Sequence, residues 1–95
     1  GETERALEHY YASLERYRAL ALTEELARLL NNIGMALGKL SQWNAAQATF
    51  AEALMLAKEC GHEWTRMMVE LNRLAVLIQR REFDHASAAL IVQVT

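Results

Sequence analysis

Apolar residues recur along the chain with the spacing of an amphipathic helix, and the same stripe returns after a fixed interval. Ala6, Ala46 and Ala86 stand 40 residues apart, and apolar residues follow each of them by four and by eight positions. Positions separated by four lie on one face of a helix. The following layers are Tyr10, Phe50 and Leu90, then Leu14, Leu54 and Val94. The pattern predicts one helical stripe that occurs three times.

A second stripe repeats with a step of 41 residues. The segment "LLNNIGMAL" at 29–37 aligns with "ELNRLAVLI" at 70–78. The aligned pairs are Leu30 with Leu71, Ile33 with Leu74, Gly34 with Ala75, and Leu37 with Ile78. Two registers with nearly the same period indicate a tandem repeat of helical hairpins.

Breaks in the two stripes predict five helices, at about 2–20, 24–40, 44–60, 63–81 and 84–95. Thr23 and Asp84 are residue types that cap helix N-termini, and Gly61 suits a helix C-terminus. Residues 41–44 form the remaining turn. Such short connections imply that neighbouring helices are antiparallel.

Gly34 lies inside a predicted helix, where glycine costs about 1 kcal/mol relative to alanine. A small residue here, set against Ala46 of the following helix, would let the two helices of a hairpin approach closely. We expect Phe50 to fill the space between hairpins. Close packing then offsets the low helix propensity.

Composition limits the classes of protein that fit. Ninety-five residues, 53% hydrophobic and without proline, suit one small helical domain. A net charge of -2 argues against a direct nucleic-acid partner. No apolar run is long enough to span a membrane, and the charged N-terminal segment is unlike a signal peptide. With a single cysteine, no disulfide framework can form, so we expect a cytoplasmic protein.

Catalytic and metal-binding patterns are weak. His9, His62 and His85 fall on separate predicted elements, without the spacing of a helical zinc site, and we expect neither a metal nor another cofactor. Cys60 is expected to be half-buried and inert. Because no nucleophile, base and orienting group converge, we predict that the chain is not an enzyme.

The segment "LLNNIGMALGKLSQWNAAQATFAEALMLAKECG" at 29–61 resembles a tetratricopeptide repeat. The positions that carry the resemblance are Leu30, Ile33, Gly34, Leu37, Ala46, Phe50 and Ala53. It implies an all-α antiparallel helical-hairpin solenoid, wound as a right-handed superhelix. One domain, 1–95, would contain a half repeat at 1–22 and repeats at 23–61 and 62–95, and would be a fragment of a larger protein. The long period is similar to that of repeats in signal-responsive bacterial transcription regulators and in scaffold proteins.

In that family the first helix of each hairpin lines a concave groove that binds peptides or partner domains. The resemblance therefore implies a protein-interaction module in a regulatory or signalling protein, and the cations of the groove imply an acidic partner. The expected groove residues are Arg28, Asn32, Met35, Lys39, Val69, Arg73, Val76 and Arg80.

Two further expectations concern exposed apolar groups. Trp64 has no counterpart in either register and is a candidate contact residue. The alternative function is structural, with packing against another part of the chain or self-association to a homo-oligomer. The residues expected to mediate self-association are Leu90, Ile91, Val92 and Val94.

Overall fold

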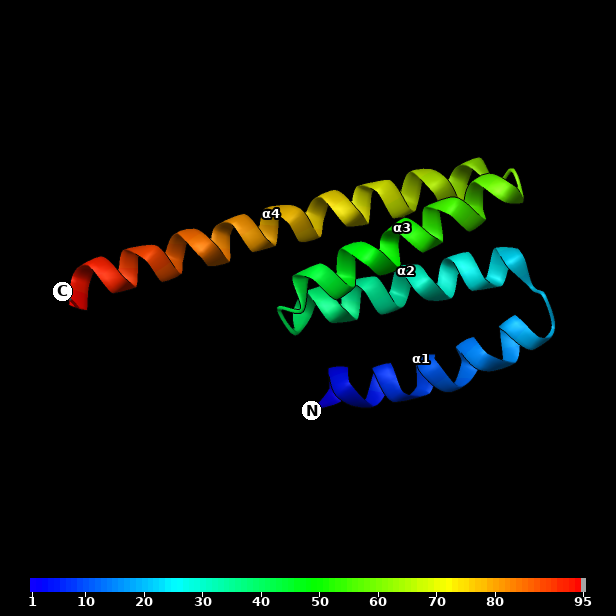
Figure 1. Cartoon of the computed structure of the whole chain (residues 1–95), viewed down its shortest axis with the longest axis horizontal. Helices are drawn as coiled ribbons and strands as arrows, with labels where there is room; N and C mark the ends of the chain where they lie inside the picture. The colour runs from blue at the N-terminus through cyan, green and yellow to red at the C-terminus, as the bar shows by residue number, and fades with distance from the viewer. Residues whose placement is uncertain (95) are drawn as a thin grey trace.

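The computed structural model describes residues 1–94, with side chains described up to Gln93. It contains four helices: α1 (Glu2–Ala19), α2 (Thr23–Lys39), α3 (Trp43–Glu59) and α4 (Glu63–Val94). No strand occurs among these residues, so the prediction of an all-α fold is confirmed. Each helix runs back alongside the one before it, and α4 continues well beyond the other three (Figure 1).

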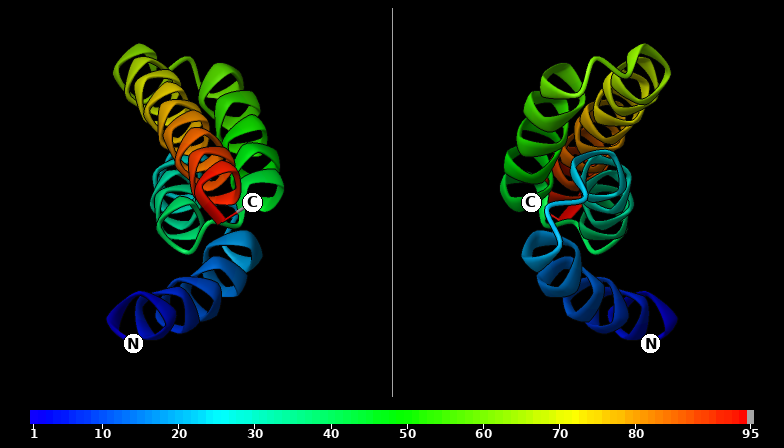
Figure 2. Two further views of the ribbon diagram at one scale, coloured as in Figure 1. Left: turned by 90° about the vertical axis from the view of Figure 1, so that its left-hand side faces the viewer. Right: turned by 90° about the vertical axis from the view of Figure 1, so that its right-hand side faces the viewer.

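The core is built around α2, which contacts each of the other helices. Its buried face carries leucine, isoleucine and small residues, and it packs mainly on the antiparallel α3. Seen end-on, α2, α3 and α4 lie close together and α1 is set to one side (Figure 2). Leu7 and Leu14 are the buried residues of α1. Among residues 1–94, no helix combines the length and the apolar character needed to cross a membrane.

Gly34 does allow a close approach, although its neighbour differs from the expected one. A Cβ atom on Gly34 would lie 2.6 Å from Cε1 of Phe50, whose side chain is fully buried. The phenylalanine ring therefore occupies the space above the glycine within the α2–α3 hairpin. Gly38 has a similar role toward α4, because a Cβ atom there would lie 2.8 Å from Cγ2 of Val76.

The three turns share one geometry and recur every 20 residues. Ala21, Ser41 and Gly61 have φ values of 53°, 60° and 67°. The next amide in each turn donates to a carbonyl five residues earlier, as Leu22 does to Tyr17 at 3.1 Å. This is the left-handed residue and hydrogen bond of a Schellman-type helix end. The expectation that Gly61 ends a helix is confirmed, whereas Thr23 is the first residue of α2 and makes no side-chain cap.

A fourth turn at the same spacing would fall at Arg81, but the chain is helical there. The prediction of separate helices at 63–81 and 84–95 is therefore wrong over the described residues. Asp84 is an internal helical residue, with Oδ2 3.8 Å from Nε of Arg80 one turn earlier. Phe83 is held against Trp43 at a ring-centroid distance of 5.8 Å. The segment 81–84 contains neither glycine nor proline, so nothing in its backbone chemistry forces a break.

Candidate functional site

Two adjoining hollows lie where α1 packs against α2, and we call them together the α1–α2 trough. The larger has a volume of about 440 Å³ and the smaller about 200 Å³. Both include Asn32, so the trough follows the exposed face of α2 over three helical turns. The larger hollow is lined by Glu2, Thr3, Ala6, Tyr10, Asn32, Met35, Ala36 and Lys39. The smaller is lined by Tyr17, Glu25, Arg28, Leu29 and Asn32.

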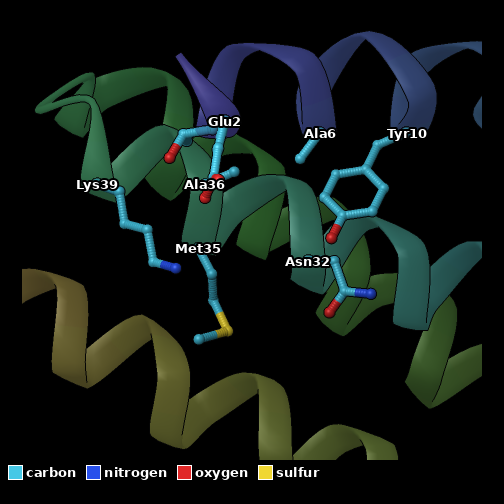
Figure 3. Close-up of a pocket in the computed structure, with 8 residues that line it drawn as sticks. Glu2, Ala6, Tyr10, Asn32, Met35, Ala36 and Lys39 are labelled. Carbon is cyan, nitrogen blue, oxygen red and sulfur yellow. The ribbon is translucent and has the colours of Figure 1, made fainter.

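Helix α2 supplies one wall of the trough because its sequence is apolar on the other side. Leu30, Ile33 and Leu37 face the core, which leaves Asn32, Met35 and Lys39 outward. Figure 3 shows these three side chains projecting from α2, with Tyr10 and Ala6 arriving from α1. The wall therefore offers an amide, a thioether and an ammonium group in succession.

The predicted groove residues on α2 come together as expected. Arg28, Asn32, Met35 and Lys39 all line the trough. Helix α1 contributes Tyr10 and Tyr17; the sequence suggested Tyr10 only as a packing position and did not single out Tyr17. Both tyrosines come from the helix that precedes α2 and packs against it.

The predicted groove residues on α4 do not join this surface. Val69 is 0% exposed and Val76 is 4% exposed, so neither presents an apolar floor to a ligand. Arg80 donates from Nη1 to Oδ1 of Asn44 at 3.4 Å, toward the start of α3. Arg73 is exposed but does not line the trough. The continuous basic strip across α2 and α4 is therefore not formed.

The charges of the trough are mixed. Lys39 shares the larger hollow with Glu2, and Arg28 shares the smaller one with Glu25. Nη2 of Arg28 also lies 3.6 Å from Oε1 of Glu24, one turn away. A ligand with both polar and charged groups fits such a surface better than a uniformly acidic one.

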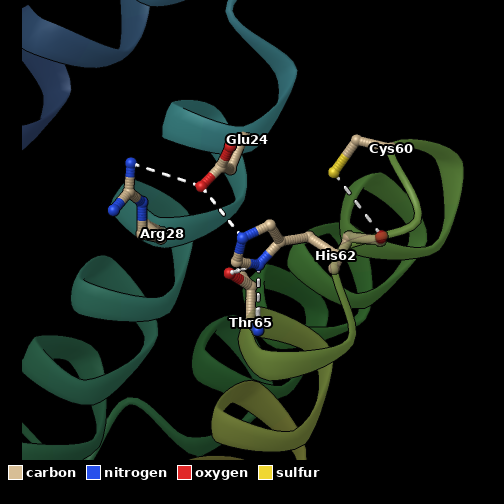
Figure 4. A network of polar contacts seen from close by, with 6 residues as sticks. Glu24, Arg28, Cys60, His62 and Thr65 are labelled. Atoms are coloured by element: carbon tan, nitrogen blue, oxygen red, sulfur yellow. Dashed lines mark hydrogen bonds and ion pairs between the residues drawn. The ribbon is translucent and has the colours of Figure 1, made fainter.

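A second polar cluster joins the start of α2 to the start of α4 (Figure 4). Nδ1 of His62 accepts the backbone N–H of Thr65 at 3.3 Å and lies 2.6 Å from the Thr65 hydroxyl. Nε2 of His62 lies 3.2 Å from Oε1 of Glu24. The imidazole thus caps α4 and ties it to α2, a structural role. Thr65 is fully buried, and no buried side-chain polar atom among the described residues lacks a partner.

Reactive and metal-binding groups are sparse in the described part of the chain. No three His, Cys, Asp or Glu side chains there are placed to hold a metal ion. Cys60 is exposed, not half-buried as expected, and its thiol donates to the carbonyl of Ala57 at 3.5 Å.

At the start of α4, a hydrogen bond from Arg66 at 2.8 Å holds the pKa of the Glu63 carboxyl below its ordinary value.

Four of the five apolar residues expected to be available for contacts are exposed. Trp64 is 70% exposed at the start of α4. Leu90, Ile91 and Val92 are exposed near its end, and the side chain of Val94 lies outside the described part of the structure.

Comparisons with known proteins give no family assignment. No protein-family model matches the chain, and neither the curated proteins nor the solved structures include a match. The geometry of the molecule is therefore the basis for assigning a function.

Proposed function

We propose that the chain is a protein-interaction module of tetratricopeptide type that binds an extended peptide segment in the α1–α2 trough. The observation that carries this proposal is the open hollow of about 440 Å³ between Tyr10 of α1 and Asn32 and Met35 of α2. An interaction role suits a surface that has shape and hydrogen-bonding groups but no paired acid, base and nucleophile.

The side chains of the trough match the groups of a peptide. The amide of Asn32 can donate to and accept from a peptide backbone. Met35 is 38% exposed and, with Tyr10, offers apolar contact; a thioether adapts easily to different side chains. Lys39 at one end can form a charge-assisted hydrogen bond with a carboxylate. We infer a peptide with an apolar side chain followed by an acidic group.

The proposed peptide binding also suggests in what kind of protein the chain acts. A module that binds peptides in this way would act inside a larger regulatory, signalling or scaffold protein of the cytoplasm. Its helical hairpins would then continue the solenoid of that protein.

The proposal is tested by selecting binders from a random peptide library and measuring their affinity by fluorescence polarisation. Asn32→Ala removes the backbone contact and should weaken binding about tenfold. Lys39→Glu should abolish any preference for an acidic residue, at a cost of about 1 kcal/mol for so exposed a charge.

Lys58→Glu on α3 is the matched control, because Lys58 is also an exposed lysine in the last turn of a helix and lies outside the trough. Selected peptides should bind this variant as they bind the original chain. If Asn32→Ala and Lys39→Glu bind normally while Lys58→Glu does not, the binding surface is elsewhere and the proposal fails.

A further inference from the structure

Helix α4 is apolar on two opposite faces. One face packs on α2 and α3 through Val69 and Val76, both buried. Ile78 follows Val76 by two positions and Val69 by nine, which places it half a helical turn away from both. The residues on the outward face are large and largely exposed: Trp64 (70%), Met67 (50%), Leu71 (67%), Leu74 (54%) and Ile78 (51%). We call these five residues the outer seam.

The spacing of the outer seam is that of a helix–helix contact. Its members follow one another by three, four, three and four positions, the alternation that keeps a stripe facing one partner helix. Isolated exposed hydrophobic residues are common, but a contiguous row of this length marks an interaction surface.

The internal repeat indicates what kind of element covers such a seam. Leu71, Leu74 and Ile78 correspond by the 41-residue step to Leu30, Ile33 and Leu37 of α2. On α2 this face is buried against the antiparallel α3, which presents small residues such as Ala46 and Ala53, both 0% exposed. The equivalent cover for α4 is therefore an antiparallel helix with alanines at the contact.

The second half of α4 contains such a segment. Ala86, Ala88 and Ala89 lie in the exposed stretch that corresponds to the start of α3. Because α4 is continuous through Arg81, this stretch points away from the outer seam of its own chain (Figure 1). In an antiparallel pair of α4 helices, the alanine-rich half of each copy lies along the outer seam of the other.

The charges are compatible with this arrangement. Arg81, Glu82 and His85 line one hollow on α4 with Ile78, between the two apolar halves. With the two-fold axis near Arg81, each arginine lies close to Arg81 of the other copy and within about one helical turn of its Glu82. In an isologous pair the residues at the axis meet their own counterparts, so the arginines and glutamates of the two copies form one mixed cluster.

We propose that the partner of the outer seam is α4 of a second copy of this chain, packed antiparallel so that residues 84–93 of one copy cover residues 67–78 of the other. The contact replaces, between chains, the hairpin that the repeat predicts within one chain. It uses a face opposite to the one that packs on α2 and α3, so the second copy meets no obstruction from them.

Analytical ultracentrifugation over micromolar concentrations tests the association. The chain should dimerise, and Leu74→Lys should raise the dissociation constant at least about tenfold, because it places a charge in the centre of the seam. Met55→Lys on α3 is the matched control, since Met55 is 57% exposed in mid-helix. It should leave dimerisation unchanged, and circular dichroism should show both variants folded.

Orientation is tested by cross-linking in a Cys60→Ser background. Chains carrying Leu71→Cys, mixed with chains carrying Ala89→Cys, should form mainly 71-to-89 links between chains. Links of 71 to 71 and 89 to 89 would indicate a parallel pair and overturn the proposal, as would dimerisation unaffected by Leu74→Lys. A monomer in which both cysteines on one chain link internally would show that residues 84–93 fold back, which also overturns it. A monomer without such links would mean that a different partner covers the outer seam, which also overturns the proposal.

Discussion

Gly34 shows how much one missing methyl group contributes to this fold. With a Cβ atom only 2.6 Å from the Phe50 ring, alanine at this position would force the ring or α2 to move. Overpacking of this kind costs about 1–3 kcal/mol, against about 1 kcal/mol gained in helix propensity.

We therefore expect Gly34→Ala to lower the free energy of unfolding by about 1–2 kcal/mol, measured by urea denaturation. Adding Phe50→Leu, which removes the clashing ring edge, should cost less in the Gly34→Ala background than in the original chain. A Gly34→Ala variant as stable as the original would contradict the close contact.

Glu63 and Arg66 provide a second prediction at the residue scale. Arg66 lowers the pKa of Glu63 in the folded chain. The ionised carboxyl therefore stabilises the fold at pH values above the pKa that Glu63 has in the unfolded chain. That contribution is lost as the pH falls through the folded-state pKa. Glu63 is exposed and Arg66 only half-buried, so the effect on stability is small.

NMR titration of the Glu63 side chain should show a higher pKa in Arg66→Gln than in the original chain. Arg81→Gln is the control. Arg81 lies three helical turns beyond Glu70, too far along α4 to contact Glu63, so its replacement should leave the Glu63 pKa unchanged. An identical Glu63 titration in Arg66→Gln would rule out the ion pair as its cause.

At the scale of the elements, two of the three turns place a residue other than glycine in the left-handed region. Ala21 and Ser41 have φ values of 53° and 60°, where a Cβ atom is unfavourable, whereas Gly61 tolerates 67° without strain. Replacing Ala21 or Ser41 with glycine should raise the free energy of unfolding by about 0.5–1 kcal/mol each. Gly61→Ala should lower it by a similar amount, and thermal and urea denaturation together would check the signs.

The sequence predicted the first three helices to within a residue at each end, because their stripes stop at positions that favour turns. It also predicted a break near residue 82, which the structure does not have. Periodicity detects the two halves of α4 but says nothing of the segment between them, where Arg81 and Glu82 are good helix formers and Phe83 is anchored on Trp43.

The same limit applies to the candidate site. The four residues of α2 that were predicted to line a groove do share one surface, since they lie on a single helix opposite its apolar stripe. Val69 and Val76 were placed on the groove by analogy, but α4 turns them toward Gly38 and the core. A stripe in a sequence identifies a helix face without telling which neighbour covers it.

On the scale of the whole molecule, α4 sets the shape. Its 32 residues span about 48 Å at 1.5 Å per residue, close to the 54 Å longest extent of the molecule. Spin labels at Arg73→Cys and Gln93→Cys, in a Cys60→Ser background diluted with unlabelled chain, should be separated by about 30 Å. A fold-back at 81–84 would instead bring them to about the 10 Å spacing of packed helices, which would contradict a continuous α4.

The chain is helical at Arg81, where the spacing of the other turns would place a fourth one. A substitution at this residue should therefore change the balance between a straight and a reversed chain. The chain reverses direction at 21, 41 and 61, and then misses the fourth reversal. Glycine at this position would lose about 1 kcal/mol in the straight form and gain about as much in the reversed form, shifting their ratio on the order of 30-fold. Arg81→Gly should thus add a short-distance population to the spin-label measurement. A single backbone torsion would then decide whether residues 84–93 fold back on their own chain or pack on a second copy.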